Sequence, residues 1–229
     1  MPDNAKNLYG LIFDVDGVIA DTEPANAKAT IKAFEDLFGV KGVHPDDFAA
    51  GIGRGDQEYV RAGARVHNLH LTDEQVRAAT MLREKYFLDL LTREPLHAFP
   101  GVLRLINSAL EDARFRLAIA TSGSFEKSHA IVKAVHVPYE QMVHISGNDV
   151  KKRKPDPEIF LLAAEHLHLT SSRCCVIEDA PDGVQAAKAA GAKCIAVTNT
   201  TTPGNLTGAD LICDSLEQIN VETIRRLID

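Results

Sequence analysis

Two aspartates separated by one residue follow an apolar run near the start of the chain. Residues 11–13 read Leu-Ile-Phe, and Asp14-Val15-Asp16-Gly17 comes directly after them. In an extended strand, side chains two positions apart point to the same face, so the carboxylates of Asp14 and Asp16 would converge. Carboxylates that close repel each other, and burial increases the cost. A divalent cation is the natural group to compensate this charge.

Other residues that can do chemistry follow three further predicted strands. Thr121-Ser122-Gly123 ends the second strand, Lys154 lies in the loop after the third, and Glu178-Asp179 ends the fourth. In a doubly wound sheet, ligands bind beyond the carboxyl ends of the strands. Carboxylates, a hydroxyl, a glycine turn and a lysine would therefore gather at one edge. Together they predict a site for a phosphate and a hard cation.

Each of these features also has a structural explanation when it is taken alone. The Asp-x-Asp-Gly stretch could be a strand-ending turn, because Asp and Gly favour turns. Thr121 and Ser122 could cap the following helix, and Asp179 could cap a helix that starts at Pro181. A calcium loop of the EF-hand type is excluded, because its glycine and glutamate positions hold Ile19 and Ala25. The four features together, each at a strand end, favour a site.

The carboxylates fit phosphoryl transfer. Asp14 is the candidate nucleophile and would form an aspartyl-phosphate. Asp16 could protonate the leaving alcohol and then activate water. We expect Mg²⁺ as the cofactor, held by Asp14, by Asp16 through its backbone or side chain, and by Asp179.

The remaining residues would hold the phosphate. Lys154 would neutralise both the nucleophile and the phosphate, and the Pro155-Asp156-Pro157 turn that follows would fix its direction. Thr121 and the backbone N–H groups of Ser122 and Gly123 would bind phosphate oxygens at a helix start.

The elements that must position these residues alternate in type from residue 96 onward. The apolar runs 116–121, 142–146, 174–178, 194–198 and 209–213 predict strands, and their continuous hydrophobicity is typical of parallel strands covered on both faces. Helical patterns lie between them at 102–110, 124–135, 157–167 and 181–190, and a last helix would open with the capping box Ser215-x-x-Gln218. The alternation predicts an α/β fold with a doubly wound parallel sheet.

Residues 23–92 differ, because their periodicity is helical almost throughout. Glu23–Phe38 places Ala27, Ile31, Phe34 and Phe38 on one stripe, and Thr72-x-x-Gln75 is a capping box. We therefore expect a helical domain at 21–95 inserted into an α/β core domain formed by 1–20 and 96–229. Its two connections would lie near Ala20–Thr22 and Pro95–Pro100.

The composition limits the classes of function. With 229 residues, 45% of them hydrophobic, and a net charge of −7, the chain does not match a general binder of nucleic acids or anionic membranes. It has no run long enough for a membrane span and no apolar signal segment near its start, so we expect a cytoplasmic protein. The four cysteines, in or beside strand-like runs, are expected to be small buried thiols. A monomer is favoured, although the sequence leaves the oligomeric state open.

The combination D-x-D-G-V, a Thr-Ser strand end, K-P-D-P and E-D resembles the haloacid dehalogenase superfamily of aspartyl-phosphate phosphotransferases. GNDVKKRKPDPEIFLLAAEHL followed by VIEDAPDGVQAAKAAG resembles especially its sugar-phosphatase and β-phosphoglucomutase branch. The resemblance covers essentially the whole chain. It implies that Asp14 is the nucleophile and Asp16 the general acid and base, that Thr121 and Lys154 bind phosphate, and that Asp179 completes the magnesium site with Glu178 supporting it.

The same resemblance implies that the helical insertion is a cap that closes over the active site. The stretch 51–56, Gly-Ile-Gly-Arg-Gly-Asp, resembles the cap loop whose arginine meets a distal phosphate in the mutase, so Arg54 is the candidate for substrate recognition. An exposed arginine at a helix start is an equally good interpretation. Arg83 or Lys85 could assist, and Asp182 is either part of a helix start or an outer contact of the site.

One departure favours a phosphatase. β-Phosphoglucomutases carry a histidine shortly after the Asp-Thr linker, where this chain has Asn26. In the mutase that histidine is tied to holding the acid–base aspartate until sugar binds. We therefore expect a Mg²⁺-dependent phosphatase acting on a small phosphorylated metabolite, most plausibly a sugar phosphate. A phosphosugar mutase of the β-phosphoglucomutase type is the alternative, and a non-catalytic binder of a phosphorylated ligand is a third hypothesis.

Overall fold

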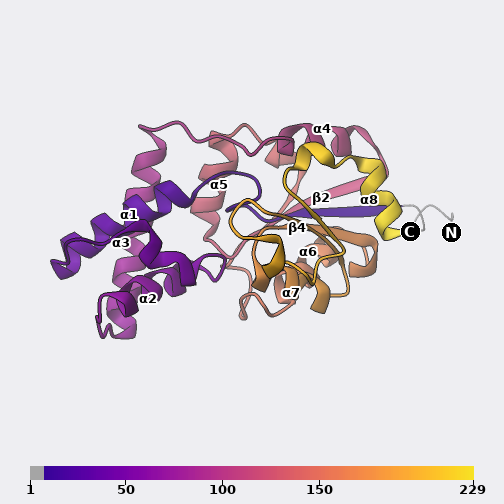
Figure 1. Cartoon of the computed structure of the whole chain (residues 1–229). Coiled ribbons are helices and arrows are strands. Elements are labelled where there is room, and N and C mark those ends of the chain that lie inside the picture. The colour runs from indigo at the N-terminus through magenta and orange to yellow at the C-terminus, as the bar shows by residue number, and fades with distance from the viewer. Residues whose placement is uncertain (1–7) are drawn as a thin grey trace.

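A computed structural model describes residues 8–229 of the chain (Figure 1). The described residues form a parallel sheet in the order β3-β2-β1-β4-β5-β6. Its strands are β1 (Tyr9–Phe13), β2 (Phe115–Ala120), β3 (Val143–Ile145), β4 (Cys174–Glu178), β5 (Lys193–Val197) and β6 (Leu211–Cys213). The predicted α/β fold with a doubly wound parallel sheet is confirmed. The predicted start of the core domain at residue 1, and the expectation about a signal segment, fall partly on residues 1–7, outside the described range.

Alternate strand residues face two separate hydrophobic cores. Leu11 and Phe13 of β1 point to one face, where they pack with residues of α4 (Val102–Glu111), α5 (Phe125–Ala134) and α8 (Val221–Ile228). Ile12 points to the opposite face, which is covered by α6 (Glu158–His166) and α7 (Pro181–Ala189). Figure 1 shows these two helical layers on either side of the strands. Burial on both faces explains why the strands are continuously apolar. The four cysteines are free and buried, as predicted.

A helical insert separates β1 from α4. It contains α1 (Glu23–Phe38), the short 3₁₀ helix η2 (Pro45–Gly51), α2 (Asp56–Val66) and α3 (Asp73–Leu91). The stripe predicted on α1 packs in a separate hydrophobic cluster with Phe48 and Tyr59, and the predicted capping box of Thr72 and Gln75 is present. These four elements are called the helical insert below. The division into a core domain and a cap domain stays a prediction.

The two connections of the insert run side by side. Ala20 pairs with Ala98 in an antiparallel bridge, and the Phe99 N–H donates to the Ile19 carbonyl at 3.0 Å. The chain therefore leaves and re-enters the α/β part at one place, next to the carboxyl end of β1.

The prediction for the start of the last helix was wrong. Ser215 accepts a hydrogen bond from the Glu217 N–H at 3.1 Å and begins a short 3₁₀ helix, η6 (Leu216–Gln218). The chain is extended again at Ile219, and α8 begins at Val221 with Asn220 as its N-cap. Asn220 accepts from the Thr223 N–H at 2.9 Å, which is the contact that a helix start needs. The remaining 3₁₀ helices of the described chain are η3 (Tyr139–Gln141), η4 (Ser171–Arg173) and η5 (Pro203–Asn205).

Candidate active site

The candidate nucleophile lies at the end of the central strand. All five residues of β1 are buried, and Asp14 follows them with its N–H bonded to the Ile177 carbonyl at 3.1 Å. Asp14 is 7% exposed. Burial raises the pKa of Asp14 to about 7, while Lys154 opposes this shift and Glu178 adds to it. The site therefore holds a carboxylate whose negative charge needs further compensation.

Lys154 supplies part of that compensation. Its ammonium lies 2.5 Å from Asp14 Oδ1 and 2.6 Å from Glu178 Oε1, and it faces the ring of Phe160 at 4.9 Å. Burial lowers the pKa of Lys154, but Asp14 and Glu178 raise it by more, so the ammonium stays charged. The Lys154–Pro155 peptide is cis. The predicted contact between Lys154 and the nucleophile is present.

Glu178 and Asp179 play different parts at the end of β4. Glu178 Oε2 accepts from the N–H groups of Asp179 and Ala180 at 3.0 and 3.2 Å, so both of its oxygens have protein partners. Asp179 accepts from the Thr200 hydroxyl, and burial, then Glu178 and Asp14, raise the pKa of Asp179 well above its ordinary value. Glu178 thus supports the site, and Asp179 is the carboxylate with capacity for another partner.

The carboxylates meet the requirements of a divalent cation. Oxygens of Asp14, Glu178 and Asp179 lie within 4.8 Å of one another, and all three residues are buried. Lys154 is the cation that contacts this cluster, so the local charge remains negative. Carboxylate oxygens are the donors that a hard cation such as Mg²⁺ favours. Asp14 and Asp179 would hold the ion, while Glu178 is bound by Lys154.

The Asp16 side chain does not belong to that cluster and has other partners. Its Oδ1 accepts from the Thr22 hydroxyl at 2.5 Å and the Asn26 amide at 3.3 Å, and lies 3.2 Å from Lys127 Nζ. Asp16 as a metal ligand stays a prediction, and the position of its carboxylate suits the acid–base role. The contact with Asn26 was not predicted, because the sequence indicates only that Asn26 replaces the histidine of the mutases.

The predicted phosphate-binding residues follow β2. Thr121 is 1% exposed, and its Oγ1 accepts from the Gly123 N–H at 3.1 Å. Ser122 and Gly123 lie in the turn before α5. The helix itself is capped by Ser124, which accepts from the Lys127 N–H at 3.1 Å. Thr121 and Ser122 are therefore not the cap, and Thr121 faces the same cavity as Asp14.

The two cap arginines lie in different places. Arg83 is 2% exposed and lines the cavity, where it donates to Thr30 and Asn26 at 2.8 Å and pairs with Asp56. Arg54 is half-exposed and pairs with Asp182 at 3.0 Å, in a groove outside the cavity. The roles of both arginines in substrate recognition stay predictions. The Arg54–Asp182 pair gives Asp182 a contact with the insert.

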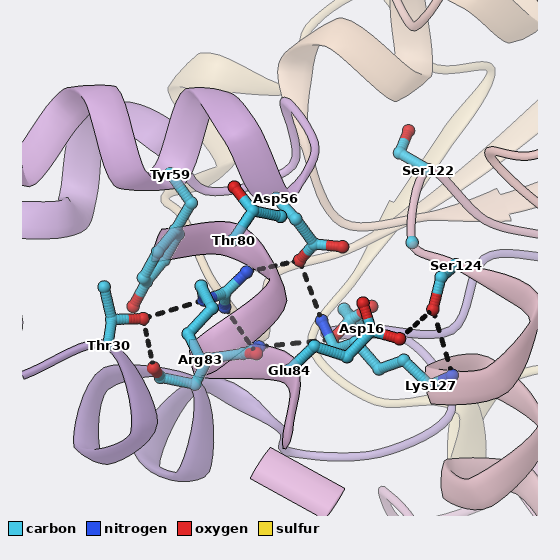
Figure 2. A network of polar contacts seen from close by, with 12 residues as sticks. Asp16, Thr30, Asp56, Tyr59, Thr80, Arg83, Glu84, Ser122, Ser124 and Lys127 are labelled. Carbon is cyan, nitrogen blue, oxygen red and sulfur yellow. Dashed lines mark hydrogen bonds and ion pairs between the residues drawn. The ribbon is translucent and has the colours of Figure 1, made fainter. Parts of the chain in front are cut away.

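A buried polar network, which the sequence did not predict, joins the insert to the core (Figure 2). Lys127 of α5 is 4% exposed and lies 3.3 Å from Asp56 as well as 3.2 Å from Asp16. Glu23 accepts from the Tyr59 hydroxyl in the same cavity. Lys127 lies one turn after Ser124, the N-cap of α5. Because α5 starts at the carboxyl end of β2, this position could have indicated that Lys127 lies near the strand ends. Its partner Asp56 lies 71 residues away, and no local pattern connects them.

These residues surround one cavity of about 60 Å³. Its core side carries the nucleophile candidate and the phosphate-binding residues, and its insert side carries the polar network. The residues that line it include Asp14, Asp16, Thr22, Glu23, Asn26, Asp56, Tyr59, Arg83, Thr121, Ser122, Gly123, Lys127, Lys154, Glu178, Asp179, Ala180 and Thr200. The candidate nucleophile, the candidate acid–base group and the candidate cation donors thus line one cavity, as phosphoryl transfer would require.

Comparison with known families agrees with this geometry. The family model described as haloacid dehalogenase-like hydrolase matches residues 11–197. The chain belongs to that family. Phosphatases are found among its relatives, and this haloacid dehalogenase-like protein is a phosphoric monoester hydrolase.

Similar proteins include enzymes and one much longer chain. Hexitol phosphatase A of Escherichia coli is 34% identical over 93% of both chains. Protein SUPPRESSOR OF QUENCHING 1, chloroplastic, of Arabidopsis thaliana is 32% identical over 97% of this chain, which spans about a fifth (21%) of that protein's length. A mutant of CbbY from Rhodobacter sphaeroides, solved in complex with xylulose 1,5-bisphosphate, is 27% identical and covers 95% of this chain and 99% of its own, with a TM-score of 0.85.

Proposed function

We propose that this hydrolase is a Mg²⁺-dependent phosphatase that cleaves a small phosphorylated metabolite, a sugar phosphate, through an aspartyl-phosphate intermediate. The observation that carries the proposal is the position of Asp14, which contacts Lys154 at 2.5 Å and belongs to the buried carboxylate cluster. Similarity to a hexitol phosphatase and to a CbbY that binds a sugar bisphosphate supports the substrate class.

The chain's own residues suffice to describe the two steps. A carboxylate oxygen of Asp14 attacks phosphorus, the P–O bond to the alcohol breaks, and the leaving oxygen takes a proton from Asp16. Water then attacks the aspartyl-phosphate and gives its proton to Asp16, which releases inorganic phosphate and restores Asp14. Thr121, the turn after it and Lys154 would hold the phosphate oxygens during both steps.

Bound Mg²⁺ would neutralise charge on the phosphate and orient it. Asp14 and Asp179 would hold the ion. Glu178 would hold Lys154 in contact with Asp14. Thr22, Asn26 and Lys127 contact the Asp16 carboxylate, which is not one of the clustered carboxylates. Asp16, which would move protons, is thus held by other side chains than Asp14 and Asp179, which would hold the cation.

Release of phosphate from p-nitrophenyl phosphate in the presence of Mg²⁺, followed by a broad panel of phosphorylated metabolites, tests the proposal. Asp14→Asn should lower kcat by about 10³-fold or more, because it removes the nucleophile. Asp112→Asn is the matched control, since Asp112 pairs with Arg114 before β2, at the opposite edge of the sheet. Full turnover by the Asp14→Asn variant would refute the assignment.

A phosphosugar mutase is the second candidate, and the Asn26–Asp16 contact of 3.3 Å favours keeping it in the test. A side chain that holds the acid–base aspartate away from water protects a phosphoenzyme, which a mutase needs. With β-glucose 1-phosphate as substrate, a mutase would accumulate glucose 6-phosphate faster than free phosphate, and a phosphatase would do the reverse.

Cellular location and assembly remain proposals. Within residues 8–229, no helix has the length and hydropathy to cross a membrane. The free, buried thiols support a reducing compartment, and we propose the cytoplasm. The expectations of a monomer and of no nucleic-acid or membrane partner stay predictions.

A further inference from the structure

We propose that the site selects esters with a single phosphate and several hydroxyl groups, and that it rejects a second phosphate. This proposal rests on the proposed function, because it describes the substrate of the same cavity. A sugar bisphosphate needs two clusters of cationic groups, one at each end. Lys154 belongs to the cluster for the phosphate that reacts, so the question is which cations are free for the other.

Inside the cavity, the cations of the insert side are already matched by carboxylates. Arg83 is bound by Asp56, Asn26 and Thr30, and its guanidinium lies 4.7 Å from the centre of the Tyr59 ring. Each nitrogen of the Arg83 guanidinium therefore already donates a hydrogen bond to a protein oxygen. Figure 2 shows Arg83 and Lys127 converging on the one carboxylate of Asp56.

Lys127 is matched in the same way. It contacts the carboxylates of Asp16 and Asp56, and it also lies 5.1 Å from the centre of the Phe87 ring. A distal phosphate that recruited Lys127 would have to take it from Asp16 or Asp56, and both carboxylates would then be buried with less compensation.

Arg54 at the rim is also matched. Its guanidinium lies 3.0 Å from the carboxylate of Asp182 on α7, which holds the arginine in the outer groove. Arg153, in the same groove, is exposed and donates to the Ser122 carbonyl at 2.6 Å. A second phosphate would therefore have to displace Asp182 before it gained Arg54.

The insert side of the cavity suits hydroxyl groups. Glu23, Asn26, Asp56 and Tyr59 line it, and they offer carboxylate, amide and phenol groups that bind hydroxyls. A phosphate dianion brought next to Asp56 would meet a like charge and would compete with Asp56 for Arg83 and Lys127, which costs binding energy. Groups that bind hydroxyls, beside an Arg83 and a Lys127 already paired with carboxylates, favour a polyol or sugar monophosphate.

Matched pairs of ligands that differ by one phosphate test the proposal. We would compare fructose 6-phosphate with fructose 1,6-bisphosphate, and xylulose 5-phosphate with xylulose 1,5-bisphosphate. The monophosphate of at least one pair should have a kcat/KM about 10-fold or more above that of its bisphosphate. The Asp14→Asn variant, titrated by calorimetry with the same ligands, should show the same order of affinity without turnover.

Asp182→Asn frees Arg54 and should improve kcat/KM for the bisphosphates by about 3-fold or more while changing the monophosphates little. Asp112→Asn is the control: it also breaks an aspartate–arginine pair, and the Asp112 side chain is 17% exposed against 20% for Asp182. Equal or better use of the bisphosphates by the native protein would overturn the proposal, as would an Asp182→Asn effect no larger than the control's.

The two proposals fail in different ways. If no ester releases phosphate, the proposed function is wrong, and the calorimetric order of affinities still decides the selection. Failure of both monophosphates to bind the Asp14→Asn variant would overturn the selection as well.

Discussion

Lys127 of α5 and Asp56 of α2 form a buried ion pair of 3.3 Å that joins the α/β part of the chain to the helical insert. Burial lowers the pKa of Lys127, but Asp16 and Asp56 raise it by more, so the pair is ionised. Breaking a buried pair leaves a charge without its partner, which is more costly than losing an exposed one.

We expect Lys127→Met to lower the free energy of unfolding by about 3 kcal/mol. A double-mutant cycle with Asp56→Asn, measured by urea denaturation, should give a coupling energy above about 1 kcal/mol. The control cycle uses Lys28→Met and Glu94→Gln, a pair of 2.6 Å whose side chains are about half-exposed. Its coupling should stay below about 0.5 kcal/mol. Equal coupling in the two cycles would show that Lys127 does not join the two parts.

Gly17 is required by the carboxylate cluster beside it. Its φ is +81°, and a Cβ at this position would lie 2.1 Å from Asp179 Oδ2. Gly17→Ala should therefore displace Asp179 and lower kcat/KM by about 10-fold or more, besides costing about 1 kcal/mol of stability for the backbone.

Gly39→Ala separates the two effects. Gly39 has a φ of +65°, and a Cβ there would meet nothing within 4 Å. The Gly39→Ala variant should lose about as much stability as the backbone cost in Gly17→Ala, but it should keep full phosphatase activity. Thermal unfolding and phosphate release, measured on both variants, check this prediction. Unchanged activity in Gly17→Ala would mean that Asp179 tolerates displacement.

The strand-end residues could be predicted because their signals are local. Asp14 follows a buried apolar run, and Glu178-Asp179 ends another, so each position is readable within about five residues. Parallel pairing then brings these ends together without further information. The doubly wound fold, the position of α1 and the capping box of α3 follow from the same kind of short-range pattern.

The insert side of the cavity could not be predicted, since its contacts are long-range. Asp56 meets Arg83 and Lys127 at separations of 27 and 71 residues. Arg83 was a candidate for substrate recognition, but nothing local indicates its pairing with Asp56 or the burial of Lys127. The direction of Arg54 depends on Asp182, which is brought near only by the packing of the insert on α7. The start of α8 was misplaced because Ser215 and Asn220 are both good caps, and only packing selects between a 3₁₀ turn and a helix.

Mg²⁺ should stabilise the folded protein through Asp179. At a free concentration 100 times the dissociation constant, binding adds about 2.7 kcal/mol to the free energy of unfolding. Asp179→Asn should abolish this gain. Without Mg²⁺ the variant should be as stable as the native protein or more stable, because burial, Glu178 and Asp14 all disfavour the Asp179 carboxylate. Thermal unfolding with Mg²⁺ and with a chelator measures both effects.

Asp182→Asn is the control for that experiment. Asp182 lies in the first turn of α7, three residues after Asp179, but pairs with Arg54 outside the carboxylate cluster. The stabilisation of the Asp182→Asn variant by Mg²⁺ should therefore match that of the native protein. Retention of the full stabilisation by Asp179→Asn would exclude Asp179 as a ligand.

Glu23 should make stability depend on pH. It lies in the first turn of α1 and accepts from the Tyr59 hydroxyl. Burial raises the pKa of Glu23 to about 7 from an ordinary 4.5; the hydrogen bond from Tyr59 lowers it, and Asp16 raises it further. The folded state therefore binds this proton more tightly than the unfolded state. Stability contributed by the protonated group is present below pH 4.5 and is lost as the pH rises through about 7.

Glu23→Gln keeps an oxygen acceptor for Tyr59 and removes the titration. Relative to the native protein, the variant should gain about 2 kcal/mol of unfolding free energy between pH 4.5 and 7.5. Other titrating groups, including Asp14, are present in both proteins and cancel in the difference. Glu35→Gln, at an exposed position on the same helix, is the control for exchanging a glutamate for glutamine in α1. Denaturant titrations at four or five pH values measure the slope. A flat difference for Glu23→Gln would show that Glu23 is not held in an environment that disfavours its charge.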